Sequence, residues 1–189
     1  ISAGTDSIIK NSTILGAIHP YDNGVHKYGI SGMDNALITS NLLSSVGIEA
    51  TDGSTVSNNT LIGPNGLGIR LNSIDDDPLT VSGNTIMDKP GIGLSIQGSG
   101  NVTISNNIII RNGKRWGKEG ISVGGSGNVT ISNNTIADSG AGTGISVTGT
   151  SGVYIDINGN RIHRNSEDSW RDGSALHITG GLGASSTIQ

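Results

Sequence analysis

The chain has 189 residues, a formal net charge of -4 and 33% hydrophobic residues, with 31 glycines, 4 prolines and no cysteine. High glycine with little proline and no strict three-residue period excludes a collagen-like chain, and evenly spaced β-branched residues argue against disorder. The acidic balance predicts no nucleic-acid partner, no apolar run is long enough to cross a bilayer, and disulfides and cysteine-held zinc are excluded. The composition therefore favours an architecture in which a thin hydrophobic core is repeated many times along the chain.

Two short phrases alternate along the chain and predict its strands. The first phrase is Gly, apolar, any, apolar, and it begins at Gly29, Gly47, Gly68, Gly93, Gly120 and Gly144, with a looser copy at 175–178. The second phrase occupies 9–14, 38–43, 56–61, 81–86, 104–109, 131–136 and 157–162. Both phrases alternate apolar and polar residues with period two, which is typical of strands, and no stretch has a helical period.

One position of the second phrase is occupied by asparagine in almost every copy. The members of this column are Ser12, Asn41, Asn59, Asn84, Asn107, Asn134 and Asn160. The variable spacing predicts coils with constant strands and variable loops, stacked about 4.8 Å apart. Asparagine tolerates left-handed backbone, and its amide can bond to neighbours on both sides of a stack. We therefore expect a structural asparagine column at a sharp inward turn.

The phrases 101–107 and 128–134 resemble the parallel β-helix repeat of the pectin-lyase-like superfamily, and the resemblance covers nearly the whole chain. It implies an all-β fold, a right-handed parallel β-helix of about seven coils, in one domain over residues 1–189. Members of that superfamily include polysaccharide lyases, hydrolases, epimerases, phage tailspikes, copper-binding proteins and adhesins, so the fold alone does not select an activity. The resemblance also makes a trimer one form of self-association to expect.

Both ends of the solenoid are expected to be uncapped. Residues 1–6 align with 48–53, inside a coil, and the chain ends part-way through another coil. One interpretation is a fragment or processed piece of a longer chain. The other is that copies of the molecule cover the open coil ends, and such head-to-tail stacking would build a filament.

The connections after the second phrase vary most in length, and two long ones carry unusual residues. Residues 111–119 and 161–172 hold both tryptophans and seven of the 11 Lys and Arg residues. They belong to coils two apart, about 10 Å from each other, with the short connection 138–143 between them. We expect a notch with aromatic walls. The candidate substrate-binding residues are Arg111, Arg115, Trp116, Lys118, Arg164, Trp170 and Arg171.

Aromatic rings suit the C–H faces of sugars, and Arg and Lys suit carboxylate or sulfate groups. The first long connection is locally basic, which favours an anionic polysaccharide as the partner. The alternative is that these connections carry charge only for solubility and that each tryptophan folds over a coil edge.

Catalysis is less well supported by the sequence. Lyase or epimerase chemistry needs a base and a cation beside the substrate carboxylate, and hydrolysis needs two carboxylates across the bond. The candidate catalytic residues are Lys118, His163, Glu167 and Asp168. No characteristic signature of these enzymes accompanies them, so enzymatic activity stays open, as a polysaccharide lyase, an epimerase or a glycoside hydrolase.

One turn carries three adjacent carboxylates, Asp75, Asp76 and Asp77. They repel one another unless they are solvated or bind a cation, so calcium is one interpretation and a solvated turn ending at Pro78 is the other. His19 and His26 are too few to hold a metal by themselves. The sequence requires no cofactor.

The sequence therefore supports two hypotheses. The first is a β-helix, extracellular or at a cell or virion surface, that binds a polysaccharide through the connections around Trp116 and Trp170. If the protein is an enzyme, it would also process this polysaccharide. The second is a structural β-helix segment of a fibre, adhesin, phage tailspike or stacked filament that has no catalytic activity.

Overall fold

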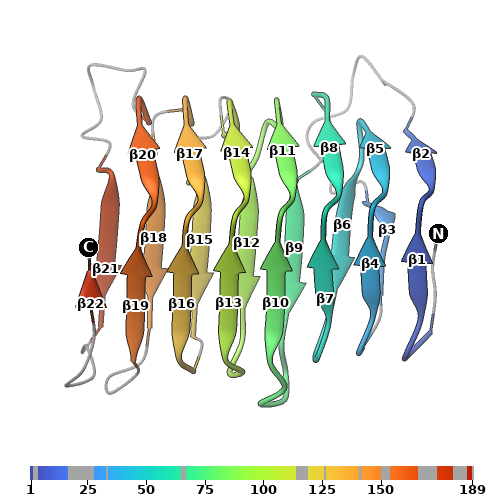
Figure 1. The fold of residues 1–189 in the computed structure, drawn as a ribbon, viewed down its shortest axis with the longest axis horizontal. Coiled ribbons are helices and arrows are strands. Elements are labelled where there is room, and N and C mark those ends of the chain that lie inside the picture. Colours follow the sequence, from blue (N-terminus) through green and yellow to red (C-terminus); the bar gives the residue numbers. More distant parts are fainter. Residues whose placement is uncertain are drawn as a thin grey trace.

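The computed structural model is a stack of coils, and each coil adds one strand to each of three parallel sheets (Figure 1). The structure describes residues 1, 4–16, 28–32, 34–64, 67–113, 119–125, 127–140, 142–149, 154–165, 174–180 and 187–188. All regular elements in this part of the chain are strands. It contains no helix with the length and apolar character that a membrane crossing requires.

We number the sheets 1 to 3 in the order in which a coil visits them. Sheet 1 contains β1 (Ile8–Lys10), β4 (Leu37–Thr39), β7 (Thr55–Ser57), β10 (Leu79–Ser82), β13 (Val102–Ser105), β16 (Val129–Ser132), β19 (Ile155–Asn158) and β22 (Thr187–Ile188). Sheet 2 contains β2 (Thr13–Leu15), β5 (Leu42–Ser44), β8 (Thr60–Ile62), β11 (Thr85–Met87), β14 (Ile108–Ile110), β17 (Thr135–Ala137) and β20 (Arg161–His163). Sheet 3 contains β3 (Tyr28–Ile30), β6 (Gly47–Ala50), β9 (Ile69–Asn72), β12 (Leu94–Gln97), β15 (Ile121–Gly124), β18 (Ile145–Thr148) and β21 (Leu176–Thr179).

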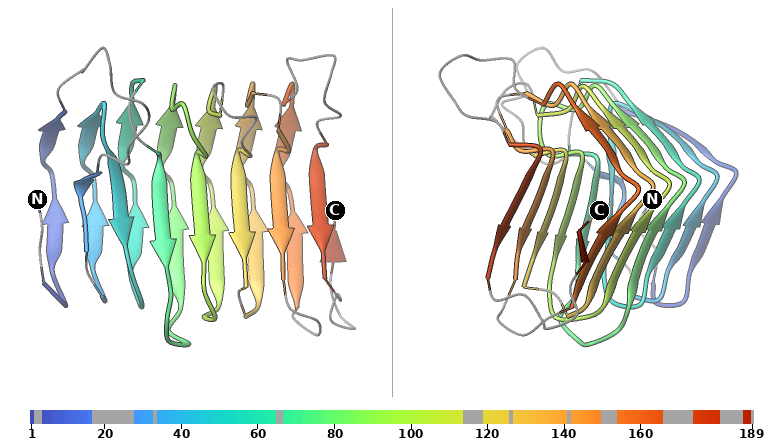
Figure 2. Two further views of the ribbon diagram at one scale, coloured as in Figure 1. Left: turned by 180° about the vertical axis from the view of Figure 1, so that it is seen from behind. Right: turned by 60° about the vertical axis from the view of Figure 1, so that its left-hand side comes forward.

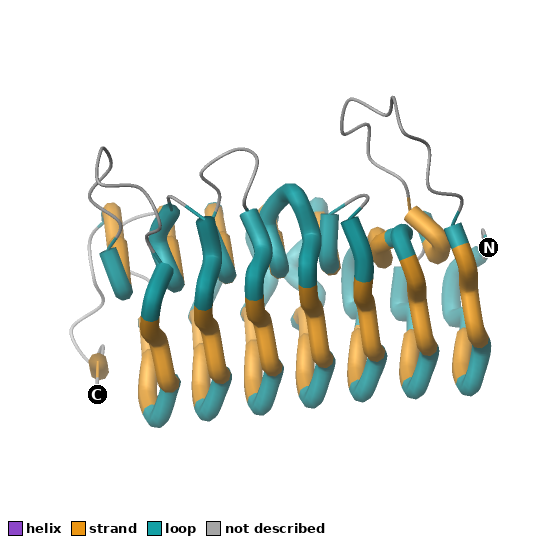
Figure 3. Tube along the Cα trace, turned by 90° about the horizontal axis from the view of Figure 1, so that it is seen from above, coloured by secondary structure: helices purple, strands orange, loops and turns teal. Residues whose placement is uncertain are grey.

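Every third strand in the chain is a hydrogen-bonded neighbour, so the strands stack coil upon coil in register. The three sheets have eight, seven and seven strands among the described residues, which corresponds to about seven coils. Figure 2 shows that sheets 1 and 2 meet at an angle while sheet 3 closes the coil opposite them, and Figure 3 shows the coils as parallel slices. The predicted parallel β-helix is confirmed.

The second sequence phrase forms two strands and the corner between them. In the third coil, Val56 and Leu61 point inward and are fully buried, while Ser57 and Thr60 face outward. The first phrase forms the strands of sheet 3, where Ile69 and Leu71 are buried in the same way. Burying one such aliphatic side chain contributes about 1.5–3 kcal/mol, and stacking identical positions joins them into one continuous core.

The predicted asparagine column lies at the corner between sheets 1 and 2. The side-chain oxygen of Asn107 accepts hydrogen bonds from the backbone N–H of Asn84 at 2.9 Å and from its side-chain amide at 3.0 Å. The amide of Asn107 donates to the Val81 carbonyl at 3.0 Å. The same contacts repeat from Asn41 to Asn160, and the N–H of Ser12 donates to Asn41 at 3.0 Å. The column therefore hydrogen-bonds to the coils on either side of each member, as expected.

The expected backbone of the column is wrong in one respect. The residue in the left-handed region is the one before each column asparagine, for example Asn58 at φ 54°, Gly83 at φ 64° and Asn106 at φ 57°. The preceding residue makes the sharp bend, and this leaves the column residue free to point its amide into the core. Only small or amide side chains stand at the bend because left-handed backbone is costly for most L-residues.

The glycine that opens the first phrase is required by the stacking of coils at the start of sheet 3. A Cβ at Gly93 would lie 2.5 Å from the Ile109 methyl and 2.9 Å from the Gly120 carbonyl oxygen of the next coil. A Cβ at Gly47 would lie 2.6 Å from the Gly68 carbonyl oxygen. The glycine column thus lets the chain enter sheet 3 at the closest possible approach between coils.

Candidate functional site

The two long connections leave the solenoid at the corner between sheets 2 and 3. The last residues of β14, β17 and β20 are Ile110, Ala137 and His163, and they are paired in that order in sheet 2. The connections that follow β14 and β20 therefore begin two coils apart on the same edge, with the shorter connection after β17 between them. This confirms the predicted placement of the connections, and each one leads directly into a strand of sheet 3.

Most of the predicted site residues lie outside the described part of the chain. These residues are Arg115, Trp116, Lys118, Glu167, Asp168, Trp170 and Arg171, together with His19 and His26. The described candidates for binding and catalysis are Arg111, His163 and Arg164, which stand where the two long connections begin, and the three candidate metal ligands Asp75, Asp76 and Asp77 are described as well. The aromatic walls of the expected notch therefore stay a prediction.

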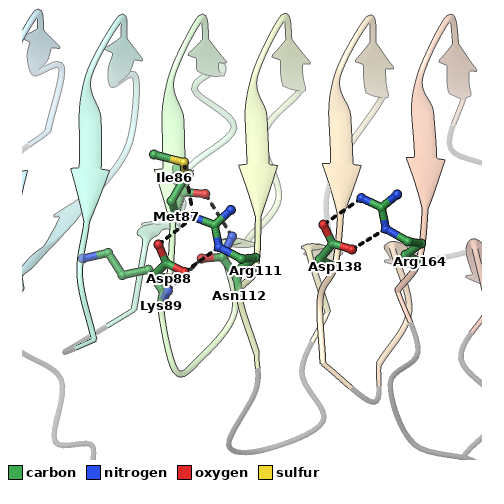
Figure 4. A network of polar contacts seen from close by, with 8 residues as sticks. All are labelled: Ile86, Met87, Asp88, Lys89, Arg111, Asn112, Asp138 and Arg164. Carbon is green, nitrogen blue, oxygen red and sulfur yellow. Dashed lines mark hydrogen bonds and ion pairs between the residues drawn. The ribbon is translucent and has the colours of Figure 1, made fainter.

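The two described arginines each hold an aspartate of the preceding coil (Figure 4). Arg111 donates from Nε to Asp88 at 2.7 Å and from Nη2 to the other carboxylate oxygen at 2.8 Å. Arg164 donates to Asp138 in the same bidentate way, at 2.6 and 3.1 Å. All four residues have φ between 52° and 59°, so they occupy equivalent left-handed positions. The corner therefore carries a row of alternating acidic and basic side chains along four successive coils.

The charges of this row act on one another. The hydrogen bond from Arg164 lowers the pKa of Asp138, and the charges of Arg164, His163 and Arg111 add to this effect while burial opposes it. The hydrogen bond and the charge of Asp88 raise the pKa of Arg111 in the same way. Both arginines thus stay cationic, with part of their donor capacity committed to aspartate and the rest open to a ligand.

His163 lies at the end of β20 on the outer face of sheet 2 and is partly exposed. It pairs with Ala137 of the preceding coil in sheet 2, and its charge contributes to lowering the pKa of Asp138. Among the predicted catalytic residues it is the one within the described part of the chain, so any acid–base pair with Lys118, Glu167 or Asp168 stays a prediction.

The outer face of sheet 3 holds polar residues that the sequence analysis did not single out. They occupy the variable position of the first phrase and pair in register in the order Glu49, Arg70, Ser95, Ser122, Ser146 and His177. The signal was present in the sequence, because this position is the one outward-facing residue between two buried aliphatic ones. We call this set the sheet 3 row.

Tyr28 lies beside the first members of the sheet 3 row. Burial raises the pKa of Tyr28, the hydrogen-bonding contact with Arg70 opposes that shift, and the Glu49 carboxylate adds to it. One end of the row therefore combines an aromatic ring, a cation and an anion, the middle has short hydroxyl side chains, and the exposed His177 stands at the other end.

The three adjacent carboxylates lie in the exposed turn between sheets 3 and 1. The backbone N–H groups of Ile74 and Asp75 donate to Asp52 of the preceding coil at 2.7 and 3.1 Å. Burial would raise the pKa of Asp52, but hydrogen bonds from Ser73 and from these amides outweigh it and lower the pKa. Among the described residues, no group of three His, Asp or Glu side chains is arranged to hold a metal ion.

Comparison with known proteins agrees with the architecture. The chain matches the model of a family described as the right-handed β-helix region over residues 1–162. No curated protein matches the chain, and no solved structure matches it. The family match and the three parallel sheets confirm the resemblance to the pectin-lyase-like β-helix repeat proteins. With most of its length matched, the chain belongs to the right-handed β-helix family.

Proposed function

We propose that the protein binds an anionic polysaccharide, outside the cell or at a cell or virion surface. The ligand would lie along the outer face of sheet 3 and contact the connections that enter β15 and β21. The observation that carries this proposal is the register of β14, β17 and β20. It sets the starts of the two tryptophan-bearing connections on one edge, two coils apart, and beside one polar sheet face.

The chemistry of the sheet 3 row supports a sugar ligand. Hydroxyl, imidazole and guanidinium groups hydrogen-bond to sugar hydroxyls, and a guanidinium also pairs with a carboxylate in two parallel hydrogen bonds. Arg70 and His177 stand towards opposite ends of a run of three serines, of which Ser95 and Ser146 are buried and Ser122 is partly exposed, so a long ligand would contact several coils mainly through Arg70, Ser122 and His177. Contacts that are weak one by one then add along the solenoid axis.

The connections would supply what the sheet face lacks. Trp116 and Trp170 are the two tryptophans of the chain, and each lies in one of the connections that start at this edge. Their rings would cover the C–H faces of sugar units while the nearby Arg and Lys residues attract the acidic groups. The proposal assigns binding and no reaction.

Affinity electrophoresis tests this proposal directly. The wild-type chain would run in native gels that contain polygalacturonate, alginate or a neutral β-glucan, beside the double variant Trp116→Ala/Trp170→Ala and the single variant Arg70→Ala. We expect retardation in at least one of the acidic gels and its loss in both variants. Thr103→Ala is the matched control, because Thr103 faces outward from sheet 1, and it should leave the retardation unchanged.

Two outcomes would overturn the proposal. If the wild-type chain migrates alike in all gels, the structural β-helix hypothesis replaces polysaccharide binding. If retardation persists in both variants but is lost in Thr103→Ala, binding occurs on another face. Analysis of the gel polysaccharides for shortened or unsaturated products would separately show whether any reaction takes place.

A further inference from the structure

A lysine is buried inside the solenoid at the corner between sheets 2 and 3. Lys89 follows β11 and is 1% exposed, which makes it the largest of the fully buried side chains of the described residues. Lysine is almost never fully buried in proteins unless its amine is paired, because removing a charged amine from water is costly. Its presence in a thin aliphatic core therefore requires a physical explanation.

The lysine stands at a position that recurs at this corner in successive coils, and we call these positions the corner column. Each member follows a left-handed residue at the end of a sheet 2 strand, and six successive coils contribute Val46, Pro64, Lys89, Asn112, Ser139 and Asn165, of which all but the exposed Pro64 are buried. The amide of Asn112 donates to the Ile86 carbonyl of the preceding coil at 3.0 Å, and the amide of Asn165 donates to the Ile136 carbonyl at 3.2 Å. These asparagines repeat the bonding of the column between sheets 1 and 2.

Lys89 replaces this bonding where asparagine is missing. The preceding coil has Pro64 in the column, and proline has neither a backbone N–H nor a side-chain donor. The Lys89 side chain extends away from Asn112, towards the preceding coils (Figure 4). Its Nζ donates to the Val46 carbonyl two coils back at 2.9 Å and contacts the Ile62 carbonyl of the intervening coil at 3.5 Å. One side chain therefore connects three coils.

Among the described residues of the neighbouring elements, the following charged groups are directed away from the core. Strands β5, β8 and β11 carry no charged residue, and Asp88 pairs with Arg111 on the outside of the corner. Glu49 and Arg70, on strands β6 and β9, belong to the outer face of sheet 3. Burial is the cause that lowers the pKa of Lys89 to about 8.

We propose that Lys89 is a proton-sensitive brace, and that protonation of its amine makes the corner of the second to fourth coils open more readily than the later coils. A neutral amine keeps two N–H donors, which can still bond to the Val46 and Ile62 carbonyl oxygens without the charge. The charge adds a burial cost that the open corner, where water reaches the amine, does not have. This proposal is independent of polysaccharide binding.

The direction of the pH effect follows from the two protonation equilibria. The pKa of Lys89 is about 8 in the closed structure, against 10.5 for a solvated lysine. Between these values the open corner binds more protons than the closed one, so closure becomes more favourable as the pH rises. The cost of burying the charge is fully present below pH 8 and is gone above about pH 10.5.

Native-state hydrogen exchange tests the brace. The reporters are the amides of Ser45 and Gly63, which bond to the Ile62 and Met87 carbonyls, and the references are the amides of Arg111 and Asp138 at the same corner of later coils. We expect protection of the reporters relative to the references to rise roughly thirtyfold between pH 7 and pH 9.5. The rise should be absent in Lys89→Met, which removes the amine and keeps most of the apolar part of the side chain, and present in Lys10→Met, which removes an exposed lysine of sheet 1.

A titration of the wild-type protein makes the test independent of any variant. The Cε resonance of Lys89, assigned by its loss in Lys89→Met, should titrate with a midpoint near 8. A midpoint near the ordinary value of about 10.4 would overturn the proposal, since the amine would then be no harder to protonate than in water. An identical pH profile of reporter protection in the wild type and in Lys89→Met would overturn it as well.

Discussion

The two corners that flank sheet 2 share a backbone conformation but use different residues at the position that follows the left-handed residue. Between sheets 1 and 2, asparagine fills the column in six successive coils, Asn41 to Asn160, and the first five are buried. Between sheets 2 and 3, six coils use Val46, Pro64, Lys89, Asn112, Ser139 and Asn165. The members of both columns follow a left-handed residue, and all but the exposed Pro64 point into the core, so the backbone geometry is shared and the side chains are not.

Connection length explains the difference. At the first corner two residues separate the strands in every coil, as Ser40 and Asn41 do between β4 and β5. At the second corner the chain continues from the column into connections of very different length before it enters sheet 3. A side chain that bonds to both neighbouring coils can repeat only where those coils have the same path. The corner between sheets 1 and 2, which we call the uniform corner, therefore stabilises the solenoid. At the corner between sheets 2 and 3, which we call the variable corner, binding residues can be added with the least loss of stacking interactions.

The largest effect should come from breaking the uniform corner. In Asn107→Ala the buried N–H of Asn84 loses its acceptor and the Val81 carbonyl loses a donor. Leaving buried polar groups unsatisfied costs about 1–3 kcal/mol for each, so we expect a loss of about 3 kcal/mol in the free energy of unfolding. Urea denaturation followed by circular dichroism measures it.

The matched control is the preceding residue. Asn106 is exposed at φ 57°, and the equivalent position holds glycine in the coil of Gly83 and in that of Gly159. Asn106→Gly should therefore change the unfolding free energy by only a few tenths of a kcal/mol. Equal losses in Asn106→Gly and Asn107→Ala would show that the bend, and not the hydrogen-bonded column, supports this corner.

A smaller loss should follow from filling the glycine column next to the variable corner. In Gly120→Ala the new methyl group would collide with the Ile136 methyl and lie 2.8 Å from the Gly144 carbonyl oxygen. Overpacking of this kind costs about 1–3 kcal/mol because backbone of the next coil must move. Ala175 holds the same position in a later coil and is exposed. Ala175→Gly should have little effect, and a similar loss in both variants would contradict the packing explanation.

The stability of the variable corner should increase when asparagine is introduced at a position of the corner column that lacks it. The hydroxyl group of Ser139 is buried and has no hydrogen-bond partner among the described residues, whereas Asn112 and Asn165 on either side each bond to the preceding coil. In Ser139→Asn the amide can reach the Ile109 carbonyl, so we expect a gain of about 1 kcal/mol. Thermal unfolding of the variant measures it. A loss instead would mean that this position lacks the room that Asn112 and Asn165 have beside Gly93 and Gly144.

The contrast between the corners also explains what the sequence could predict. The asparagine column, the alternating strands and the placement of the long connections follow from the repeated phrases, because each copy has the same neighbours above and below. The burial of Lys89 could not be predicted from the sequence of its own coil, because its role depends on Pro64 of one neighbouring coil and Val46 of another. The sheet 3 row could not be predicted from the repeat because its position varies from copy to copy, although Arg70 and His177 are residues of the kind that a ligand would contact.

The smallest effect should come from the ion pairs on the outside of the variable corner. Arg164→Ala removes the bidentate partner that lowers the pKa of Asp138, so this pKa should rise towards its ordinary value. A carboxylate with a lowered pKa contributes stability above its unfolded pKa and loses it as the pH falls through the folded pKa. The variant should therefore differ from the wild type only slightly at neutral pH and not at all in acid. NMR titration of the Asp138 side chain measures the shift, and Arg111→Ala, which acts on Asp138 through charge alone, should move it less. A larger shift in Arg111→Ala would show that the row acts as one electrostatic unit instead of two separate pairs.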